Sequence, residues 1–435
     1  MVHKKFSRRN FIKGLFGAGI LHRAELVTLK IDREENVPKI REYRTLGRTG
    51  FKVSDIGCGP ILIREELILK ELLKRGVNFI NSAENFGRPN EVMIGKAIKE
   101  FNRKSLFITT MLMLKEAETK DDIMNRARKC MERLQTDYID CLMIHAAAST
   151  KEVKDKEFHK AAKQLKIEER VRSVGISCHG ASWGHTPEES MKDVLGAAIE
   201  DGRFDLLLLV YNFIQQEEGQ QILKACRMKN IGTTLMKTNP FGGSYSYFME
   251  LKEKYESEGK EVPLTLQEVD RKFREKQAKA GPFIEKYKLS DKNQIRDAAI
   301  RFVLNNPDVH SVLITYRNFD DVETYVGLSG SRLTDFDQKK LVAYSHIFND
   351  SYCRHACGKC ESQCPHGVPI NTIMRFHHYF ISQNLEKFAM QQYAKLRGPS
   401  ASLCSDCSGY CEAACPYEVS IHALLSIAHF NLTLG

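Results

Sequence analysis

Long apolar runs are missing from this 435-residue sequence: no segment reaches the roughly 18 consecutive apolar residues of a membrane span. A strong charge imbalance is also missing, because 65 basic residues stand beside 55 acidic ones, a formal net charge of +10. Tryptophan occurs once, and no motif combines basic with aromatic residues as nucleic-acid-binding proteins do. We therefore expect no nucleic-acid partner, and no transmembrane span beyond an N-terminal signal anchor.

Cysteine, in contrast, is plentiful after residue 352, where eight of the thirteen cysteines form two tetrads. The tetrads are Cys353, Cys357, Cys360, Cys364 and Cys404, Cys407, Cys411, Cys415, each followed by proline. Closely spaced thiolates suit an iron–sulfur cube, which needs four soft sulfur ligands. Zinc is an alternative, but it needs only two Cys-x2-Cys pairs per ion, and a disulfide framework suits a small secreted domain without a large core. The pattern favours iron–sulfur clusters.

Both tetrads resemble the C-x2-C-x2-C-x3-C-P runs of bacterial ferredoxins, with one additional residue in each run. In those proteins the fourth cysteine of each run binds the other cluster. The resemblance therefore implies two [4Fe-4S] clusters, one on Cys353, Cys357, Cys360 and Cys415, the other on Cys404, Cys407, Cys411 and Cys364. The five remaining cysteines are scattered singly, and we expect small buried hydrophobic residues there: Cys58, Cys130, Cys141, Cys178 and Cys226.

The N-terminus carries a different signal, because Ser7-Arg8-Arg9-Asn10-Phe11-Ile12-Lys13 precedes a small apolar run over residues 14–21. This segment resembles a twin-arginine export signal, a route that suits a protein that must acquire clusters and fold before it crosses a membrane. The apolar run is short and no small-x-small cleavage site follows, so an ordinary basic tail is the alternative. We expect a periplasmic or envelope location, with a cytoplasmic one as the alternative, and a signal and linker over residues 1–40.

Between residues 43 and 335, short β-branched runs alternate with amphipathic stretches, which is typical of βα units around a parallel sheet. Eight candidate strands are the number for a TIM barrel: 53–56, 77–81, 106–110, 138–144, 172–177, 206–210, 232–236 and 311–315. We expect an α/β fold with a (β/α)8 TIM barrel over residues 41–340, followed by a small, mainly α ferredoxin-like iron–sulfur domain over 341–435. A Lys/Glu-rich insertion near 242–291 is expected to form helices over the C-terminal ends of the strands, the barrel mouth.

Several motifs in this region resemble the landmarks of aldo-keto reductases, especially members with a C-terminal ferredoxin module. They are Leu46-Gly47-Arg48-Thr49-Gly50, Gly76 to Glu84, Leu134 to Asp140, Tyr211-Asn212 and Arg317-Asn318. The resemblance implies a (β/α)8 barrel and an ancestral NADPH-dependent carbonyl reduction. It also implies that Arg317 and Asn318 belong to a degenerate NADP(H) site.

The catalytic tetrad of that family is broken in this sequence. By the resemblance, its Asp, Tyr and Lys correspond to Asn81, Phe86 and Met111, and only its His is kept, as His145. Two positions that hold the nicotinamide amide have become Cys178 and Leu208. Hydride transfer from a nicotinamide to a ketone is therefore not the expected reaction.

His145, His179 and Lys237 each follow a predicted strand and are the candidate catalytic residues at the barrel mouth. A structural histidine is the alternative for His145. We expect an iron–sulfur oxidoreductase or electron-transfer protein that exchanges electrons with a redox protein partner and acts on a small-molecule substrate. The alternatives are an NADP(H)-dependent carbonyl oxidoreductase with a modified site, and a non-catalytic electron-transfer subunit whose barrel is a docking scaffold.

Overall fold

The computed structural model describes residues 37–63, 65–180, 189–240, 245–405 and 407–433. Residues 40–435 form one compact unit. The twin-arginine-like segment lies outside the described residues. Within the described part of the chain, no helix is both long and apolar enough to cross a membrane.

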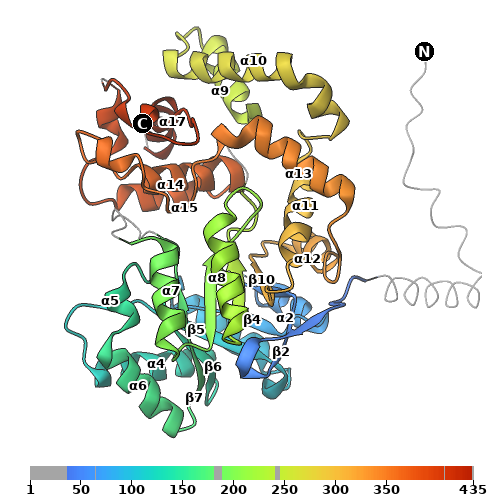
Figure 1. Ribbon diagram of the computed structural model, residues 1–435, viewed down its shortest axis with the longest axis vertical. Helices are drawn as coiled ribbons and strands as arrows, with labels where there is room; N and C mark the ends of the chain where they lie inside the picture. Colours follow the sequence, from blue (N-terminus) through green and yellow to red (C-terminus); the bar gives the residue numbers. More distant parts are fainter. Residues whose placement is uncertain (1–36, 64, 181–188, 241–244, 406, 434–435) are drawn as a thin grey trace, which may run out of the picture. The chain divides into compact units, whose positions relative to one another are not determined.

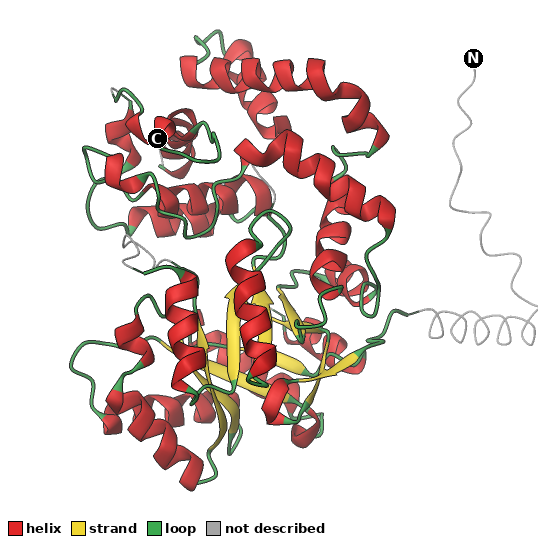
Figure 2. Ribbon diagram, viewed as in Figure 1, coloured by secondary structure: helices red, strands yellow, loops and turns green. Residues whose placement is uncertain are grey.

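Eight parallel strands close into a barrel, with β10 pairing both β9 and β3 (Figures 1 and 2). The strands are β3 (Ile56–Cys58), β4 (Phe79–Asn81), β5 (Phe107–Leu112), β6 (Ile139–Ile144), β7 (Val171–Ser177), β8 (Leu206–Val210), β9 (Gly232–Met236) and β10 (Ser311–Ile314). Nearly all of their residues are buried, because helices cover the outer face and side chains fill the interior. The predicted (β/α)8 barrel is confirmed.

Helices alternate with the strands along the chain, as the amphipathic stretches predict. They are α2 (Glu66–Lys74), α3 (Arg88–Ile98), α4 (Lys120–Leu134), α5 (Thr150–Val153), α6 (Lys156–Ile167), α7 (Met191–Asp201), α8 (Glu217–Met228), α11 (Lys292–Leu304) and α12 (Phe319–Val326). Short 3-10 turns η2 to η5 lie at Gly47–Thr49, Pro60–Leu62, Glu84–Phe86 and Arg103–Ser105. The apolar faces of these helices and the outward-facing strand residues form one core around the barrel.

The first predicted strand was placed wrongly. Residues 52–54 instead form β2 (Lys52–Ser54), which pairs antiparallel with β1 (Tyr43–Thr45) in a hairpin, and the barrel strand begins at Ile56. Asp55 separates the two because its buried carboxylate accepts hydrogen bonds from the Ser329 hydroxyl (2.6 Å) and the Gly330 amide (2.7 Å). A buried carboxylate at this point requires those distant donors, and local periodicity does not reveal them.

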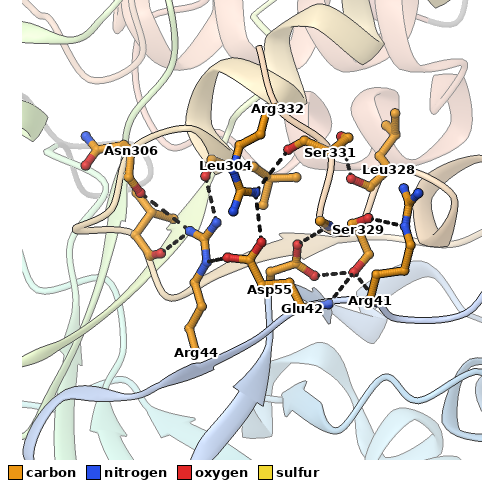
Figure 3. A network of polar contacts seen from close by, with 12 residues as sticks. Arg41, Glu42, Arg44, Asp55, Leu304, Asn306, Leu328, Ser329, Ser331 and Arg332 are labelled. Atoms are coloured by element: carbon orange, nitrogen blue, oxygen red, sulfur yellow. Dashed lines mark hydrogen bonds and ion pairs between the residues drawn. The ribbon is translucent and has the colours of Figure 1, made fainter.

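The hairpin is fastened to the N-terminal end of the barrel by a polar network (Figure 3). The Arg44 guanidinium donates to the carbonyls of Leu304 (2.7 Å) and Val309 (2.5 Å) and pairs with Glu42 (2.7 Å). Arg41 donates through Nε to the Ser329 carbonyl at 2.6 Å. These bonds satisfy carbonyls that the helix end and the following turn leave without donors.

The C-terminal region is helical, and its helices gather beside the barrel (Figure 1). They are α13 (Asp335–Phe348), α14 (Ile370–Gln383), α15 (Glu386–Ala394), α16 (Tyr410–Ala413) and α17 (Ile421–Leu432), with 3-10 turns η6 (Asn349–Ser351), η7 (Glu361–Gln363) and η8 (Ala401–Cys404). Cys360, Cys404 and Cys411 are buried in the core that α14 and α17 share.

The insertion is helical as predicted, with α9 (Tyr245–Ser257) and α10 (Leu264–Lys286). Its expected position over the barrel mouth is wrong for these two helices. Phe248, Leu251 and Leu266 pack into the core of the C-terminal region, and α10 contacts α13 and α17. Their apolar faces need a partner, and the small C-terminal core provides one.

The five single cysteines are buried as expected. Burial raises the pKa of Cys178 to about 12 and raises the pKa of Cys58 as well, so these thiols stay protonated at neutral pH. Both are structural apolar residues rather than nucleophiles.

Candidate functional site

The three predicted rim residues all lie at the C-terminal ends of barrel strands. His145 follows β6, and its amide donates to the Leu112 carbonyl at the end of β5 (2.9 Å). His179 lies two residues beyond β7, and Lys237 follows β9 in a left-handed conformation (φ +59°). The strand register therefore brings these side chains to one end of the barrel.

A row of three imidazoles crosses from the barrel to the C-terminal region. The rings of His145 and His179 are 6.4 Å apart, and Nδ1 of His179 lies 3.3 Å from Nε2 of His355. The three side chains are only 8%, 9% and 6% exposed. His355 comes from the first cysteine tetrad, so the barrel mouth is completed by a residue 176 positions further along the chain than His179.

Burial keeps this row neutral. It lowers the pKa of His145 to about 4, and it lowers the pKa of His179 and of His355 well below 6.5. The positive charges of Lys237 and Arg375 act in the same direction on His179 and His355. Among the described residues, Nδ1 of His145 and Nδ1 of His355 have no hydrogen-bond partner. Neutral imidazoles with a ring nitrogen available can give or accept a proton.

Two cations, Lys237 of the barrel and Arg375 of α14, lie near this row. Lys237 donates through Nζ to the Tyr379 hydroxyl (2.7 Å), and Nζ lies 5.2 Å from the centre of the same ring. Arg375 lies one helical turn before Tyr379 on α14 and donates to the Tyr352 hydroxyl (2.9 Å). Lys237 and Arg375 make the potential at the mouth positive.

Tight backbone packing holds the first cysteine loop on the barrel. Gly180 has a φ of +85°, and a Cβ there would lie 2.9 Å from the Cβ of Ala356. Gln215, just beyond β8, donates through Nε2 to the His355 carbonyl at 2.9 Å. A larger residue at position 180 would be strained and would push the loop away.

The thiols of the first crossed set are close neighbours. The pKa of Cys353 is raised to about 12, mainly by burial, and the negative charges of Cys357 and Cys415 act in the same direction. Burial also raises the pKa of Cys360, and the negative charges of Cys353, Cys411 and Cys415 act in the same direction. Cys415 of the second tetrad thus contributes to the raised pKa of two cysteines of the first, Cys353 and Cys360.

The second crossed set shows the reciprocal arrangement. Burial raises the pKa of Cys404 to about 12, and the largest charge effects come from Cys411, Cys364 and Cys407, in that order. The pKa of Cys411 is raised by burial to about 11, and Cys364 and Cys407 contribute again. Cys364 of the first tetrad thus contributes to the raised pKa of both Cys404 and Cys411.

Two arginines are buried beside the first thiol set without a carboxylate partner among the described residues. Arg354 is 4% exposed, donates to the carbonyls of Asn349 (2.5 Å) and Tyr352 (2.7 Å), and lies 4.1 Å from the centre of the Tyr417 ring. Arg375 is 5% exposed, and its Nε atom and that of Arg354 both lack a described hydrogen-bond partner. A buried guanidinium is costly unless an anion lies nearby.

Asn371, in the first turn of α14, organises the loop between Cys353 and Cys357. Its Nδ2 donates to the Cys353 Sγ (3.3 Å) and to the Arg354 carbonyl (2.7 Å), and its Oδ1 accepts from the Ala356 amide (2.8 Å). One side chain thus fixes a thiol and the loop that carries it. Hydrogen bonds to such sulfurs also tune the potential of a bound cluster.

No three described His, Cys, Asp or Glu side chains converge on a single point in the way that one metal ion requires. A [4Fe-4S] cube makes a different demand, because each thiolate binds a different iron. Each thiol set has four cysteines, the number that a cube needs.

The altered tetrad positions form an apolar barrel interior. Met111 and Leu208 belong to one buried core, against which Phe86 packs. The ring of Phe86 meets that of His145 edge to face at 5.8 Å, and Asn81 accepts a hydrogen bond from the Thr109 hydroxyl at 2.7 Å. Phe86, the ring that contacts His145, has no proton to donate.

The residues predicted for a degenerate NADP(H) site already have internal partners. Arg317 donates to Asp321 through its amide (2.9 Å) and Nε (3.1 Å), and its Nη1 lies 3.5 Å from the Gln383 carbonyl at the end of α14. The Asn318 side chain caps α12 by accepting from the Asp321 amide (2.8 Å). A cofactor phosphate would have to displace these contacts.

Sequence reasoning missed His355, Arg375, Tyr379 and Asn371. His355 lies between two cysteines of a tetrad, so its position beside those thiols was predictable from the sequence. The other three recur at i, i+4 and i+8 on α14, a polar stripe on one helical face that directly follows the first Cys-Pro. That stripe was the available signal.

Comparison with known proteins identifies the family to which this barrel belongs. The family model "Aldo/keto reductase family" matches residues 65–345, which is more than half of the chain. The chain belongs to the aldo/keto reductase family of oxidoreductases.

Its similarity to individual relatives is modest. It is 31% identical over 126 residues to Methylglyoxal reductase DkgB of Escherichia coli O157:H7, which covers 28% of this chain and 46% of that protein. The first curated relatives are therefore matched over about half their length. Aldo-keto reductase YhdN of Bacillus subtilis (strain 168) is 24% identical over 327 residues, covering 69% of this chain and 92% of that protein. An aldo-keto reductase structure from Bacillus halodurans matches with a TM-score of 0.48 at 18% identity, over 69% of this chain and 95% of the other.

Proposed function

We propose that this protein is an iron–sulfur oxidoreductase with a degenerate aldo-keto reductase barrel. Two [4Fe-4S] clusters, held by the eight C-terminal cysteines in crossed sets, exchange electrons with a redox protein partner. A small-molecule substrate reacts at the barrel mouth. The observation that carries the proposal is that one loop presents Cys353 and Cys357 to a cluster site and His355, between them, to His179 of the barrel.

The residues around the first thiol set suit a negatively charged cube. Four thiolates on a [4Fe-4S]2+ core give a net charge of about −2. Arg354 and Arg375, buried and without described carboxylate partners, supply two positive charges at that place. The high thiol pKa values are no obstacle, because a coordinated thiol is deprotonated by the metal.

When bound, the clusters supply single electrons at low potential. The chain's own residues then have separate tasks. His145 and His179 are neutral and move protons to or from a substrate at the mouth. Lys237, oriented by Tyr379, stabilises negative charge that develops on a substrate during reduction.

The NADP(H)-dependent alternative is less well supported. Phe86 and Met111 cannot protonate a carbonyl oxygen or tune a proton donor, and Arg317 is already paired with Asp321. A non-catalytic subunit with the barrel as a docking scaffold remains the competing function. A docking scaffold would account for the barrel, but it would give no role to the row of His145, His179 and His355.

We also propose that Arg8-Arg9 directs export to the periplasm or envelope, with a cytoplasmic location as the alternative. An exported barrel has no NADPH supply, which is consistent with the loss of the tetrad. Replacing both arginines by lysine should leave the folded protein in the cytoplasm. An unchanged distribution would leave the basic tail as the better interpretation.

Anaerobic reduction tests the proposed function. Protein treated with a reduced low-potential donor should take up about two electrons per chain, one per cluster, and give cluster signals by electron paramagnetic resonance. NADPH should not reduce it. Absence of electron uptake by protein that contains iron and sulfide in full amount would refute the proposal, and reduction by NADPH would favour the alternative.

A further inference from the structure

A cavity of about 420 Å³ lies between helices of the insertion and helices of the C-terminal region. Its walls come from α9, α10, the start of α11, the end of α13 with η6, α14 and α17, most of which lie together in the upper part of Figure 1. The barrel-mouth residues His145, His179 and Lys237 do not line it, and of the eight tetrad cysteines, all of them described, only Cys353 does. The cavity is therefore neither the barrel mouth nor the space that either cluster needs.

The interior of the cavity has apolar walls. Phe248 of α9, Ile295 of α11 and Met374 of α14 line it and are only 5%, 0% and 6% exposed. Phe273 of α10 and Phe348 of α13 also line it, and their rings stack with centres 6.4 Å apart. A molecule with an apolar body gains free energy when it leaves water for such a space.

The polar side chains of the interior are already bonded within the protein. His377 accepts at Nε2 from the Asn431 side-chain amide (3.2 Å), Nε2 of His378 lies 3.3 Å from Nε2 of Gln383, and the Tyr352 hydroxyl accepts from a guanidinium (2.9 Å). No lining side chain among the described residues has a buried polar atom without a partner. Further lining side chains held by contacts within the protein are Lys272, Lys276, Tyr344, Asp350, Ser351 and Ser420.

The opening of the cavity is polar and carries an available positive charge. Gln277, Ser290 and Lys292 line the cavity and are exposed, so they lie where it meets solvent. Within the described ranges no ion pair is found for Lys292, whereas Asp350, the one carboxylate that lines the cavity there, is paired with Lys276. The opening therefore presents an ammonium group, a hydroxyl and an amide to a ligand.

We propose that this cavity binds an apolar monocarboxylate such as a fatty acid, with the apolar body inside and the carboxylate at Lys292. One ammonium matches the single charge of a carboxylate, whereas a phosphate head carries about two charges. Ser290 and Gln277 can donate to the carboxylate oxygens. A cationic head would find no unpaired carboxylate among the described lining residues, and a sugar or nucleotide would place its polar groups against apolar walls. The inference goes beyond the proposed function and does not depend on the clusters.

Binding of decanoate to the anaerobically purified full chain tests this site by calorimetry. We expect one molecule per chain, and octanoate should bind about 15-fold more weakly, because each buried methylene contributes about four-fold. Lys292→Gln should weaken decanoate binding about five-fold and leave binding of the uncharged 1-decanol unchanged. Lys279→Gln is the matched control, because Lys279 is exposed on α10 and does not line the cavity.

A second variant tests the apolar interior. Val269 lines the cavity from α10 without being fully buried, so Val269→Trp should fill the space and weaken binding of both decanoate and 1-decanol at least about ten-fold. Val342→Trp is its control, because Val342 is 45% exposed and does not line the cavity. The proposal is overturned if Lys292→Gln binds decanoate as wild type does, if it loses decanoate and 1-decanol equally, or if Val269→Trp binds both normally.

Iron content, measured on the same samples, separates this site from the proposed function. Full clusters without decanoate binding would refute the carboxylate site and leave the proposed function standing. Decanoate binding that depends on Lys292, in anaerobically purified protein that holds no iron, would support the site and count against the proposed function.

Discussion

Replacing Arg375 by glutamine should have opposite effects on the cluster-free and cluster-loaded protein. Arg375 is 5% exposed and has no carboxylate partner among the described residues; its hydrogen bond goes to the neutral Tyr352 hydroxyl at 2.9 Å. Without a cluster, the buried guanidinium is an uncompensated charge, so its removal should stabilise the protein. With a cluster of charge about −2 beside it, removal breaks a buried charge pair.

The magnitude follows from that pair. Removing one partner of a buried charge pair costs about 3–5 kcal/mol, and even about 3 kcal/mol corresponds to a roughly 100-fold loss in the affinity for the cluster. Arg375→Lys keeps the charge and should retain most of that affinity. Tyr352→Phe removes only the hydrogen bond and should cost about 1 kcal/mol.

Two assays measure the cluster-free and the cluster-loaded protein separately. Urea unfolding followed by circular dichroism measures the stability of the cluster-free protein, and retention of iron against a chelator under anaerobic conditions measures the cluster-loaded state. The reasoning is refuted if Arg375→Gln retains iron as well as wild type, or if it destabilises the cluster-free protein as much as the loaded one.

Three further predictions concern other parts of the molecule. Asn371→Asp keeps the shape of the side chain but replaces the donor to Cys353 by an acceptor, so iron retention should fall. Asn371→Gln keeps a donor amide and should lose less iron than Asn371→Asp. Equal iron retention in Asn371→Asp and wild type would contradict this role. Arg44→Ala should lower the free energy of unfolding by about 2–4 kcal/mol in urea titration, because two carbonyls lose charged donors, with iron content unchanged; a change below about 1 kcal/mol would count against the network. His145 has a pKa of about 4 in the folded protein, below its ordinary 6.5, so its contribution to stability is complete above pH 6.5 and is lost as the pH falls toward 4. His145→Asn should reduce the difference in the free energy of unfolding between these two pH values by about 3 kcal/mol. An unchanged difference would show that other groups cause it.

The sequence predicts the barrel well because βα periodicity is local. Seven of the eight strands are found at their predicted positions to within two residues at each end, which is the ordinary uncertainty of element boundaries. The exception, at residues 53–56, depends on Asp55 and its bonds to Ser329 and Gly330, which lie more than 270 positions away. Periodicity carries no information about such a contact.

The candidate site also contains residues that the sequence predicts and residues that it does not. His145, His179 and Lys237 were predictable because strand ends share one end of a parallel barrel. His355, Arg375 and Tyr379 were not, since they reach the mouth only through the packing of α14 and the cysteine loop on the barrel. The position of the insertion was mispredicted for the same reason, because the apolar partner of α9 and α10 lies after residue 350.

Iron and sulfide analysis of paired cysteine variants tests the central claim most directly. Wild type purified anaerobically should contain about eight iron and eight sulfide per chain. Cys357→Ser, Cys415→Ser and their combination should each retain about four iron, because both residues serve one cluster, whereas Cys407→Ser combined with Cys415→Ser should retain almost none. Stoichiometric zinc with little iron in the wild type would contradict the account. If the combination of 357 and 415 loses all iron while that of 407 and 415 keeps half, the crossed ligation is wrong.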